Sequence, residues 1–250
     1  MRYFLFLRYK GTLYHGWQRQ PRAVTVQQVL EEALSLKLKE EIPVTGAGRT
    51  DAGVHAEFYA AHFDSVSERL HMDKKFLFRL NRFLPDDIAV TGIRPVLSDA
   101  NARYSALSRR YKYRISRQKD PFTTDTCLLF TGPLNIGEMN MAAVILRDYT
   151  DFASFCRADS DVKTTICKVS EAFWYDHGHL LEFTISADRF LRNMVRAVAG
   201  TMLDVGKERI SVEDFRKIIE MADRKAAGQS APAHGLSLTG IEYPANIFTD

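Results

Sequence analysis

The sequence predicts an α+β fold in two domains with mainly antiparallel sheet. Amphipathic helical segments and short strand-like segments are mixed along the 250 residues, without the regular alternation that builds a parallel sheet. This length allows one large domain or two small ones. Residues 95–108 are rich in Pro, Ser, Asp, Asn and Ala and lack periodicity, so they are the expected junction. We expect an N-terminal domain over residues 1–102 and a C-terminal domain over residues 103–250.

The first half is predicted to run strand, helix, strand, strand, helix, strand. The expected elements are a strand at 3–9, a helix at 25–39, strands at 42–47 and 57–63, a helix at 74–83 and a strand at 88–94. Thr25 is suited to cap the first helix, because its hydroxyl can accept from a first-turn amide. The apolar positions expected to face inward are Val26, Val29, Leu30, Ala33 and Leu34, with Leu36 or Leu38. Pro85 stops the second helix.

The second half is predicted to contain four strands and three helices. The expected elements are a strand at 104–116, a helix at 136–147, strands at 166–175 and 180–187, a helix at 189–205, a helix after Ser211 and a closing strand at 236–242. Glu213 and Asp214 are suitably placed at the positive end of the last helix.

Composition indicates a soluble globular protein, since 46% of residues are hydrophobic and 26% charged. Residues 1–10 alternate apolar and basic side chains, which differs from the apolar region of a signal peptide, and no run approaches membrane-spanning length. Three cysteines without CxxC spacing argue against a disulfide framework and a structural zinc site. We therefore expect a cytoplasmic protein. Its formal charge of +3 does not by itself identify a nucleic-acid binder.

Residues 46–56 read GAGRTDAGVHA and follow a strand-like segment. Gly46, Gly48 and Gly53 permit backbone conformations closed to other residues, so the loop can turn sharply and bring Asp51 close to a ligand. Asp51 is therefore the first catalytic candidate. On local composition alone, a turn or cap residue is the commoner role of such an aspartate.

Residues 103–119 hold seven basic side chains and no acidic one. The period of two in a strand predicts two faces, with Arg110, Lys112 and Arg114 on one and Tyr111, Tyr113 and Ile115 on the other. The basic face suits phosphates, and the aromatic face can stack on bases or pack into a core. The plain alternative is an ordinary strand with a solvated basic side and a buried aromatic side.

The predicted helix at 189–205 also has two faces. Its core stripe is Leu191, Met194, Val195, Val198, Met202 and Val205. Arg189, Arg192 and Arg196 fall together elsewhere, and like charges repel unless something anionic meets them. A carboxylate or an RNA phosphate would satisfy them, although a solvated face is the commoner arrangement.

Histidines give weaker signals. Asp51 and His55 are four residues apart, and His177 and His179 flank a glycine, but neither spacing supplies a third metal ligand. We therefore predict no metal site, and a hairpin turn at residues 177–179.

Taken together, these residues resemble the tRNA pseudouridine synthase A family over almost the full chain. In order, the motifs are YHGWQRQ at 14–20, GRTDAGVHA at 48–56, NRFLPDDIAV at 81–90, ARYSALSRRYKYRI at 102–115, FLRNMVRAVAGTMLDVG at 190–206 and GLSL at 235–238. Ordered motifs over this length are far more specific than any one of them. Segment 162–169 departs from the family pattern, with Cys167 where a basic residue is usual, which bears on one RNA or structural contact and not on the chemistry.

The resemblance implies a pseudouridine synthase fold of two α/β subdomains, with mainly antiparallel mixed sheets and a cleft between them. The first subdomain would carry the catalytic Asp loop, and the second would complete the cleft. The implied reaction is isomerisation of uridine to pseudouridine at positions 38, 39 and 40 in the anticodon stem-loop of tRNA. The resemblance further implies a homodimer in which one tRNA touches both subunits, with no cofactor.

Carried over residue by residue, Asp51 would be the nucleophile, Tyr111 the aromatic residue against the uracil, and Arg196 the partner of the carboxylate. Arg49 would help extrude or hold the base. The remaining candidates for substrate binding are Arg110, Lys112, Arg114 and Arg192.

The chemistry agrees with these roles, because the reaction breaks a C1′–N bond, rotates the base and rejoins it through carbon. An ionised carboxylate can trap or stabilise the sugar or base while it is detached, and a nearby arginine favours the charged form. A tyrosine ring offers a face to a base taken out of the stack.

Several points stay open at this level. Asp51 can attack C1′ or C6, or act by sugar deprotonation, and the Tyr111 hydroxyl is one candidate for removing the C5 proton. Two other functions compete with the leading one. The first is a non-catalytic RNA-binding module that uses the basic strand and the arginine face. The second is a metal-dependent hydrolase built on Asp51 and His55.

Overall fold

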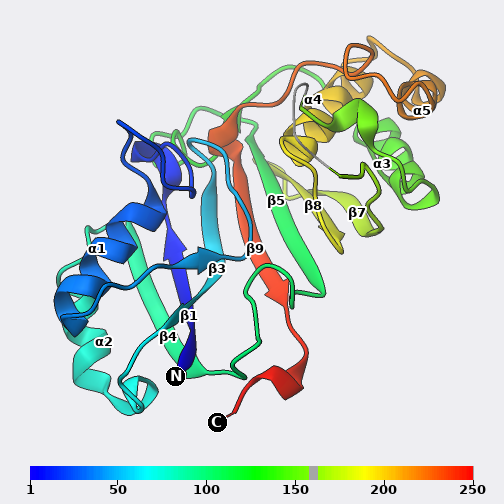
Figure 1. Ribbon diagram of the computed structural model, residues 1–250. Coiled ribbons are helices and arrows are strands. Elements are labelled where there is room, and N and C mark those ends of the chain that lie inside the picture. The colour runs from blue at the N-terminus through cyan, green and yellow to red at the C-terminus, as the bar shows by residue number, and fades with distance from the viewer. Residues whose placement is uncertain (158–162, 250) are drawn as a thin grey trace. The chain divides into compact units, whose positions relative to one another are not determined.

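The computed structural model describes residues 1–157 and 163–249 and confirms the α+β class (Figure 1). The chain divides into two compact units, Met1–Leu107 with Leu238–Asp250, and Ser108–Ser237. These bounds differ from the expected 1–102 and 103–250, because the C-terminal segment groups with the first unit. There the Leu107 amide donates to the Glu242 carbonyl at 2.8 Å.

The first unit is built on a sheet with the strand order β4-β1-β3-β9. Its strands are β1 (Arg2–Tyr9), β3 (His55–Asp64), β4 (Ile88–Pro95) and β9 (Leu236–Glu242), whose residues from Leu238 onward belong to this unit. Strand β1 is antiparallel to both β3 and β4. The strands expected at 3–9, 57–63, 88–94 and 236–242 are thus confirmed.

The strand expected at 42–47 is reduced to β2 (Thr45–Gly46), which pairs with β3. Pro43 has no backbone donor, and side chains of the preceding helix take up the amides on either side of it. The Ile42 amide donates to the Ser35 hydroxyl at 3.0 Å, and the Val44 amide donates to Glu31 at 3.1 Å. These bonds compete with a strand ladder.

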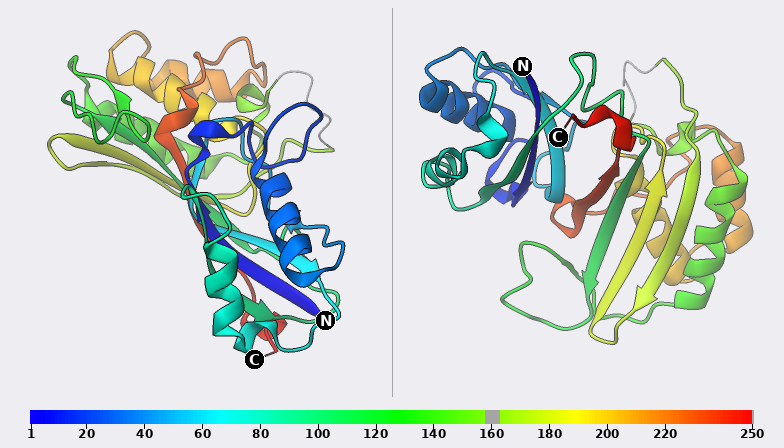
Figure 2. Two further views of the ribbon diagram at one scale, coloured as in Figure 1. Left: turned by 90° about the vertical axis from the view of Figure 1, so that its left-hand side faces the viewer. Right: turned by 90° about the horizontal axis from the view of Figure 1, so that it is seen from below.

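Helices α1 (Val26–Leu38) and α2 (Lys74–Asn81) lie on one side of this sheet (Figure 2). Thr25 caps α1 as predicted, because its side chain accepts from the Gln28 amide at 3.4 Å. Most of the predicted inward positions are buried, whereas Val29 is half-buried and Leu36 is exposed. Helix α2 ends at Asn81, earlier than expected, and the Asn81 side chain bonds both backbone groups of Val90 at 2.8 and 2.7 Å.

The second unit is built on a sheet with the order β5-β8-β7. Its strands are β5 (Ser108–Ser116), β7 (Val169–Asp176) and β8 (Leu180–Ala187), and the short β6 (Leu128–Leu129) runs parallel to β5. Strands β5 and β7 begin later than the expected residues 104 and 166. The predicted hairpin turn is confirmed, since the His177 amide donates to the Leu180 carbonyl at 2.9 Å and Gly178 has a φ of +76°.

The described residues of this unit form three α-helices, α3 (Ile136–Ile145), α4 (Met194–Gly206) and α5 (Val212–Glu220). Figure 2 shows α3 alongside the sheet. All six residues of the predicted core stripe around α4 are buried. Helix α5 begins as predicted, in a capping box between Ser211 and Asp214.

The predicted start of α4 is wrong. The helix begins at Met194, because Asn193 before it has a left-handed φ of 66°, which a right-handed helix cannot include. The Asp188 carboxylate accepts from the amides of Arg189 and Lys168 at 2.7 and 2.8 Å, which holds the preceding segment as a loop. Arg189 and Arg192 therefore do not share a helical face with Arg196.

No helix in the described ranges is both long enough and apolar enough to cross a membrane.

Candidate active site

The loop that carries Asp51 joins β2 to β3 and is framed by an upstream segment, residues 14–17. The Trp17 amide donates to the Thr50 carbonyl at 3.2 Å, and the Gly53 amide donates to the Tyr14 carbonyl at 3.3 Å. Gly16 has a φ of +86°, and a Cβ there would overlap the Thr50 carbonyl oxygen and lie 3.2 Å from the Asp51 carbonyl carbon. The YHGWQRQ and GRTDAGVHA motifs are therefore packed against each other.

Aromatic residues support the same loop from the sheet. The Tyr9 and Thr50 hydroxyls are hydrogen-bonded at 2.8 Å, and the Tyr59 hydroxyl donates to the Gly48 carbonyl. The Tyr59 ring stacks on Trp17 with centroids 4.1 Å apart. Thr50 is buried, whereas Asp51 is half-buried. The loop backbone is thus fixed around a carboxylate that retains access to solvent.

The loop glycines have different roles from one another. Gly53 has a φ of +78°, as predicted for a sharp turn. Gly46 instead leaves room for Trp17 and Tyr59, which a Cβ would overlap. Gly48 has neither a positive φ nor any atom within 4 Å of a Cβ position. The expectation of a backbone conformation closed to other residues is therefore confirmed for Gly53 and wrong for Gly46 and Gly48.

His55 has a structural role next to the Asp51 loop. It is buried, and its Nδ1 accepts from the Gly11 amide at 2.9 Å. Among the residues that the structure describes, no group of three His, Cys, Asp or Glu side chains is placed to hold a metal ion. The bond from Gly11 gives the His55 imidazole a structural partner, which argues against its use in a hydrolase built on Asp51 and His55.

The alternation predicted for β5 is confirmed. Tyr113 and Ile115 are fully buried on one face, and Tyr111 on the same face is half-buried. The Tyr111 ring makes an edge contact with Phe190 at a centroid distance of 5.2 Å, which holds its orientation.

The basic face of β5 meets carboxylates on the adjacent strand β8 and on β7 beyond it. Lys112 and Arg114 both pair with Glu182 of β8, at 2.8 and 3.0 Å, and Arg110 pairs with Glu171 of β7 at 3.2 Å. Burial by itself would raise the pKa of Glu182, but the hydrogen bonds from Lys112 and Arg114 hold it below its ordinary value. This face is therefore neither a purely solvated stripe nor a row of unopposed charges. Phosphate contacts by Lys112 and Arg114 stay a prediction.

Arg196 lies in the first turn of α4 and is bonded twice to Ala231. Its Nε donates to the Ala231 carbonyl at 2.8 Å, while the Ala231 amide donates to the Arg196 carbonyl at 2.9 Å. Burial raises the pKa of the Tyr113 hydroxyl, and the positive charge of Arg196 opposes part of that rise. The direction of the Arg196 guanidinium is thereby fixed within the second unit.

The predicted site residues fall into both units. Asp51 and Arg49 belong to the first, and those of the second are Arg110, Tyr111, Lys112, Arg114, Arg192 and Arg196. Arg192 is exposed in the loop before α4, and its carbonyl accepts from the Arg157 amide at 3.0 Å. Arg49 is exposed and lines a small hollow of about 130 Å³ with Trp17 and Arg103.

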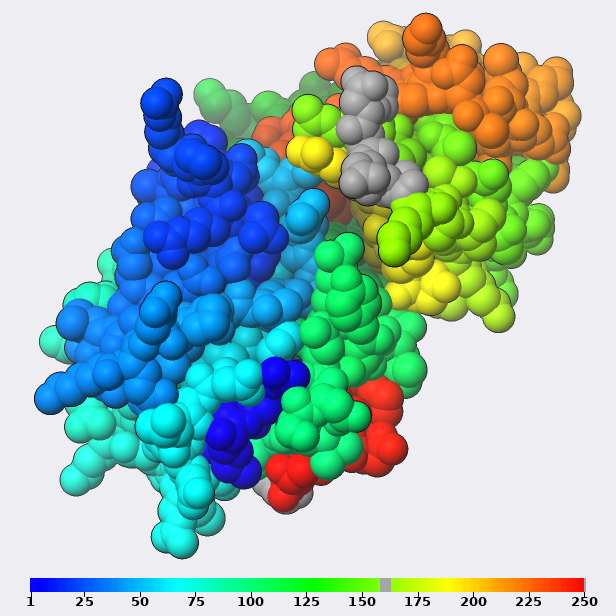
Figure 3. Space-filling model, viewed as in Figure 1, coloured from blue at the N-terminus to red at the C-terminus, as the bar shows by residue number. Residues whose placement is uncertain are grey.

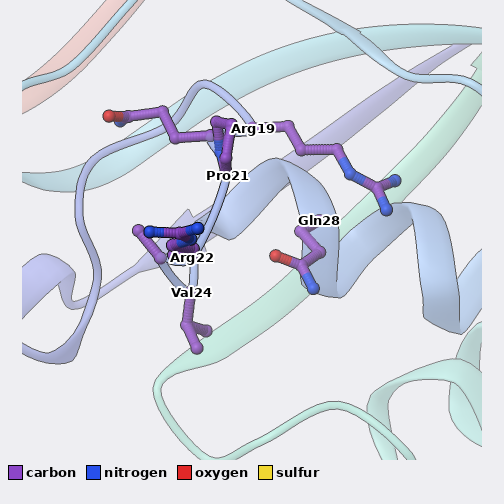
Figure 4. Close-up of a pocket in the computed structure, with 7 residues that line it drawn as sticks. Arg19, Pro21, Arg22, Val24 and Gln28 are labelled. Atoms are coloured by element: carbon purple, nitrogen blue, oxygen red, sulfur yellow. The ribbon is translucent and has the colours of Figure 1, made fainter.

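A larger hollow lies beside the first unit's loop before α1. It measures about 610 Å³ and is lined by residues 19–24 and Gln28 (Figure 4). Figure 3 shows this segment, in dark blue, projecting from the surface of the first unit. Arg19 in its lining pairs with Glu31 at 3.1 Å. Asp51 lines neither this hollow nor the smaller one. The volume of a hollow therefore does not identify the candidate catalytic residue.

Cys167, which stands where the family usually has a basic residue, is fully buried, and burial raises its pKa to about 12. It is therefore a packing residue, and not a contact for RNA. Val162, at the start of the same divergent segment, lies outside the described residues.

Reasoning from sequence missed the residues that hold the candidates in place. Gly16, Tyr9 and Tyr59 frame the Asp51 loop, and Ala231 holds Arg196. These contacts join distant segments and carry no local signal. Glu182 was detectable, because Leu180, Glu182, Thr184 and Ser186 alternate along a strand-like segment that adjoins the basic strand in a small antiparallel sheet.

An α+β chain with an aspartate on a framed glycine loop and a strand bearing tyrosines and cations is consistent with a pseudouridine synthase. Residues 142–244 match a family model described as tRNA pseudouridine synthase. The tRNA pseudouridine synthase A of Bacteroides fragilis is 50% identical over 248 residues, covering 99% of this chain and 98% of that protein. That of Parabacteroides distasonis is 48% identical over 250 residues, covering 99% and 98%. That of Bacillus subtilis is 38% identical over 247 residues, covering 97% and 99%. The chain belongs to the tRNA pseudouridine synthase A family, which confirms the resemblance of its motifs.

Proposed function

We propose that this protein converts uridine to pseudouridine in tRNA, at positions 38, 39 and 40 of the anticodon stem-loop. The observation that carries the proposal is the near full-length similarity to proteins named tRNA pseudouridine synthase A, together with Asp51 at the centre of a framed loop. The reaction is an isomerisation, so atoms and electrons balance within the nucleotide.

Asp51 is proposed as the catalytic carboxylate. As the C1′–N bond breaks, an ionised carboxylate traps or stabilises the detached fragment until the base has turned and carbon replaces nitrogen at C1′. The half-buried position supports this role, because partial desolvation strengthens the interaction with developing charge, while access to solvent lets a nucleotide reach the group. Attack at C1′, attack at C6 and sugar deprotonation all remain compatible with the proposal.

Arg196 is proposed as the partner of the Asp51 carboxylate, and Tyr111 as the aromatic face for the uracil. The bond from the Arg196 Nε to Ala231 supports a fixed guanidinium, which favours the ionised form of a carboxylate and sets its direction. The edge contact with Phe190 supports a ring held in one orientation for stacking. The Tyr111 hydroxyl is the proposed candidate for taking the C5 proton.

The other cations are proposed to bind the RNA. Arg49 holds or extrudes the base, while Arg110 and Arg192, which are exposed, contact phosphates. Lys112 and Arg114 are placed in the same group, although their pairing with Glu182 reduces the charge they offer. We also propose that the protein acts in the cytoplasm as a homodimer without a cofactor, for which sedimentation of the purified protein measures the subunit number.

The test is tritium release from a tRNA transcript labelled at carbon 5 of uridine, with no added metal or nucleotide. Wild-type protein should release tritium, and Asp51→Asn and Asp51→Ala should release none while binding tRNA normally. Transcripts that keep a single uridine at position 38, 39 or 40, followed by mass spectrometry, assign the site. Absence of release from any tRNA, or full activity of Asp51→Ala, would contradict the proposal.

The same experiment separates the competing functions. A non-catalytic RNA-binding module predicts salt-sensitive tRNA binding that is unchanged in Asp51→Asn, with no pseudouridine formed by the wild type. A metal-dependent hydrolase predicts loss of activity on chelation.

A further inference from the structure

Residues 228–232 run closely along helix α4 in the second unit. The Gly228 amide donates to the Thr201 hydroxyl at 3.0 Å. At Gly200 a Cβ would lie 2.9 Å from the Ala231 amide nitrogen and would overlap the Gln229 carbonyl oxygen. Glycine at position 200 therefore lets the two backbones approach closely, which brings Ala231 within reach of Arg196.

Ala231 binds Arg196 at both ends of the residue, as donor to its backbone carbonyl and as acceptor from its Nε. An arginine side chain has many rotamers, so a bond that anchors its Nε removes much of the freedom that would otherwise be lost on binding. The position of the guanidinium thus depends on the position of the Ala231 carbonyl.

The hydroxyl of Ser230, the residue before Ala231, ties this segment to two other elements. It accepts from the Asn193 side-chain amide at 2.6 Å and from Arg224 Nη2 at 3.0 Å. Asn193 is the N-cap residue directly before α4, and Arg224 Nη1 also bonds the carbonyls of Ala227 and Gly228, at 3.3 and 3.2 Å. The Ser230 hydroxyl therefore connects the N-cap of α4, through Arg224, to the start of the segment that anchors Arg196.

We propose that Ser230 is a positioning residue, whose hydroxyl sets the Ala231 carbonyl and through it the direction of the Arg196 guanidinium. The inference rests on the proposed function, in which Arg196 partners the catalytic carboxylate. Removal of the hydroxyl leaves the Asn193 amide and the Arg224 guanidinium without this acceptor and lets the segment shift. A displacement of a fraction of an ångström at a catalytic partner slows turnover more than it weakens substrate binding.

The first test compares three serine variants in steady-state kinetics on a tRNA transcript. Ser230→Ala should lower kcat about 10-fold with little change in tRNA Kd, since only positioning is lost. Ser230→Thr should restore turnover, because it keeps the hydroxyl. Ser211→Ala is the matched control, since it removes the α5 cap and does not touch the segment. It should lower the thermal midpoint and leave kcat unchanged.

The second test places Ser230→Ala in an Arg196→Lys background. Lysine keeps the charge but has no Nε to bond Ala231, so Ser230→Ala should lower kcat no further there. A second variant, Asn193→Gly, keeps the left-handed backbone, removes the amide and should reproduce Ser230→Ala.

The outcomes separate this inference from the proposed function. Two results would overturn the positioning role alone. One is a wild-type kcat in Ser230→Ala while Arg196→Ala is slow. The other is a loss of kcat from Ser230→Ala that is as large in the Arg196→Lys background as in the wild type. Wild-type turnover in Arg196→Ala would instead remove the proposed role of Arg196, and the positioning role with it.

Discussion

Substitution of Gly16 by alanine should damage the Asp51 loop from outside the loop itself. Gly16 has a φ of +86°, and its Cβ position lies against the peptide that joins Thr50 to Asp51. The new methyl group has no route away from this contact, because Gly16 is also fixed by the bond from the Val26 amide to its carbonyl at 3.2 Å. The peptide before Asp51 must therefore move.

The magnitude follows from two separate costs. A left-handed conformation costs alanine about 1–2 kcal/mol, and overpacking against backbone costs typically about 1–3 kcal/mol more. A loss of roughly 2–5 kcal/mol lowers the thermal midpoint by about 5–15 °C in a chain of this size. Most of the protein stays folded at 25 °C, since domains have about 5–15 kcal/mol of stability. Any large loss of turnover then reports a displaced Asp51, for which about 10- to 100-fold in kcat is expected.

The assay pairs thermal unfolding with tritium release, and Gly48→Ala is the control from the same site. Gly48 has no positive φ and no atom within 4 Å of its Cβ position, so alanine there should be close to neutral in both measurements. Wild-type stability and turnover in Gly16→Ala, or equal damage from Gly48→Ala, would refute the argument that the upstream segment sets the loop.

Three further predictions concern the second unit. The ion pairs of Glu182 hold its pKa in the folded state below its value in the unfolded chain. They therefore stabilise the native state above the unfolded-state pKa, and this stability is lost as pH falls through the folded-state pKa. Glu182→Gln should therefore lower the free energy of unfolding by about 1–3 kcal/mol at pH 7. It should also weaken the fall of this free energy with decreasing pH, as measured by urea unfolding. Glu171→Gln, which belongs to a more exposed pair, should change little. Tyr111→Phe should slow tritium release with tRNA binding largely kept, and wild-type turnover would refute a role for its hydroxyl. Arg110→Ala should weaken tRNA binding and reduce the slope of log K against log salt concentration by about one. An unchanged slope would exclude a phosphate contact.

The elements that sequence could predict are those specified by nearby residues. Thr25 caps α1 and Ser211 caps α5 within three residues of their partners, so a local pattern contains the whole interaction. The start of α4 was predicted wrongly because the residues that determine it are far apart in the sequence. The apolar stripe continues from Leu191 into the helix and suggests one unbroken element, while the left-handed turn at Asn193 is stabilised by Ser230, which is 37 residues away.

The charges on β5 show a second limit of prediction from sequence. The period of two correctly separated the cations from the tyrosines, but periodicity describes one strand and not its neighbours. Glu182 faces Arg114 only because β8 pairs antiparallel to β5 in one register, and a shift of one residue would turn that carboxylate to the opposite face. Seven basic residues without an acidic one in residues 103–119 therefore overstated the charge available to RNA.

The role of Asp51 depends on a distinction that local composition cannot make. An aspartate in an ordinary turn stabilises that turn by bonding backbone amides nearby. In this loop, residues from other segments also hold the backbone: Trp17 donates to the Thr50 carbonyl, Tyr59 donates to the Gly48 carbonyl and the Tyr14 carbonyl accepts from the Gly53 amide. Because these bonds persist when Asp51 is replaced by asparagine, the substitution should remove activity with little loss of stability, whereas a turn-forming aspartate would show the reverse. The loop can therefore keep its shape while its carboxylate changes partners during a reaction.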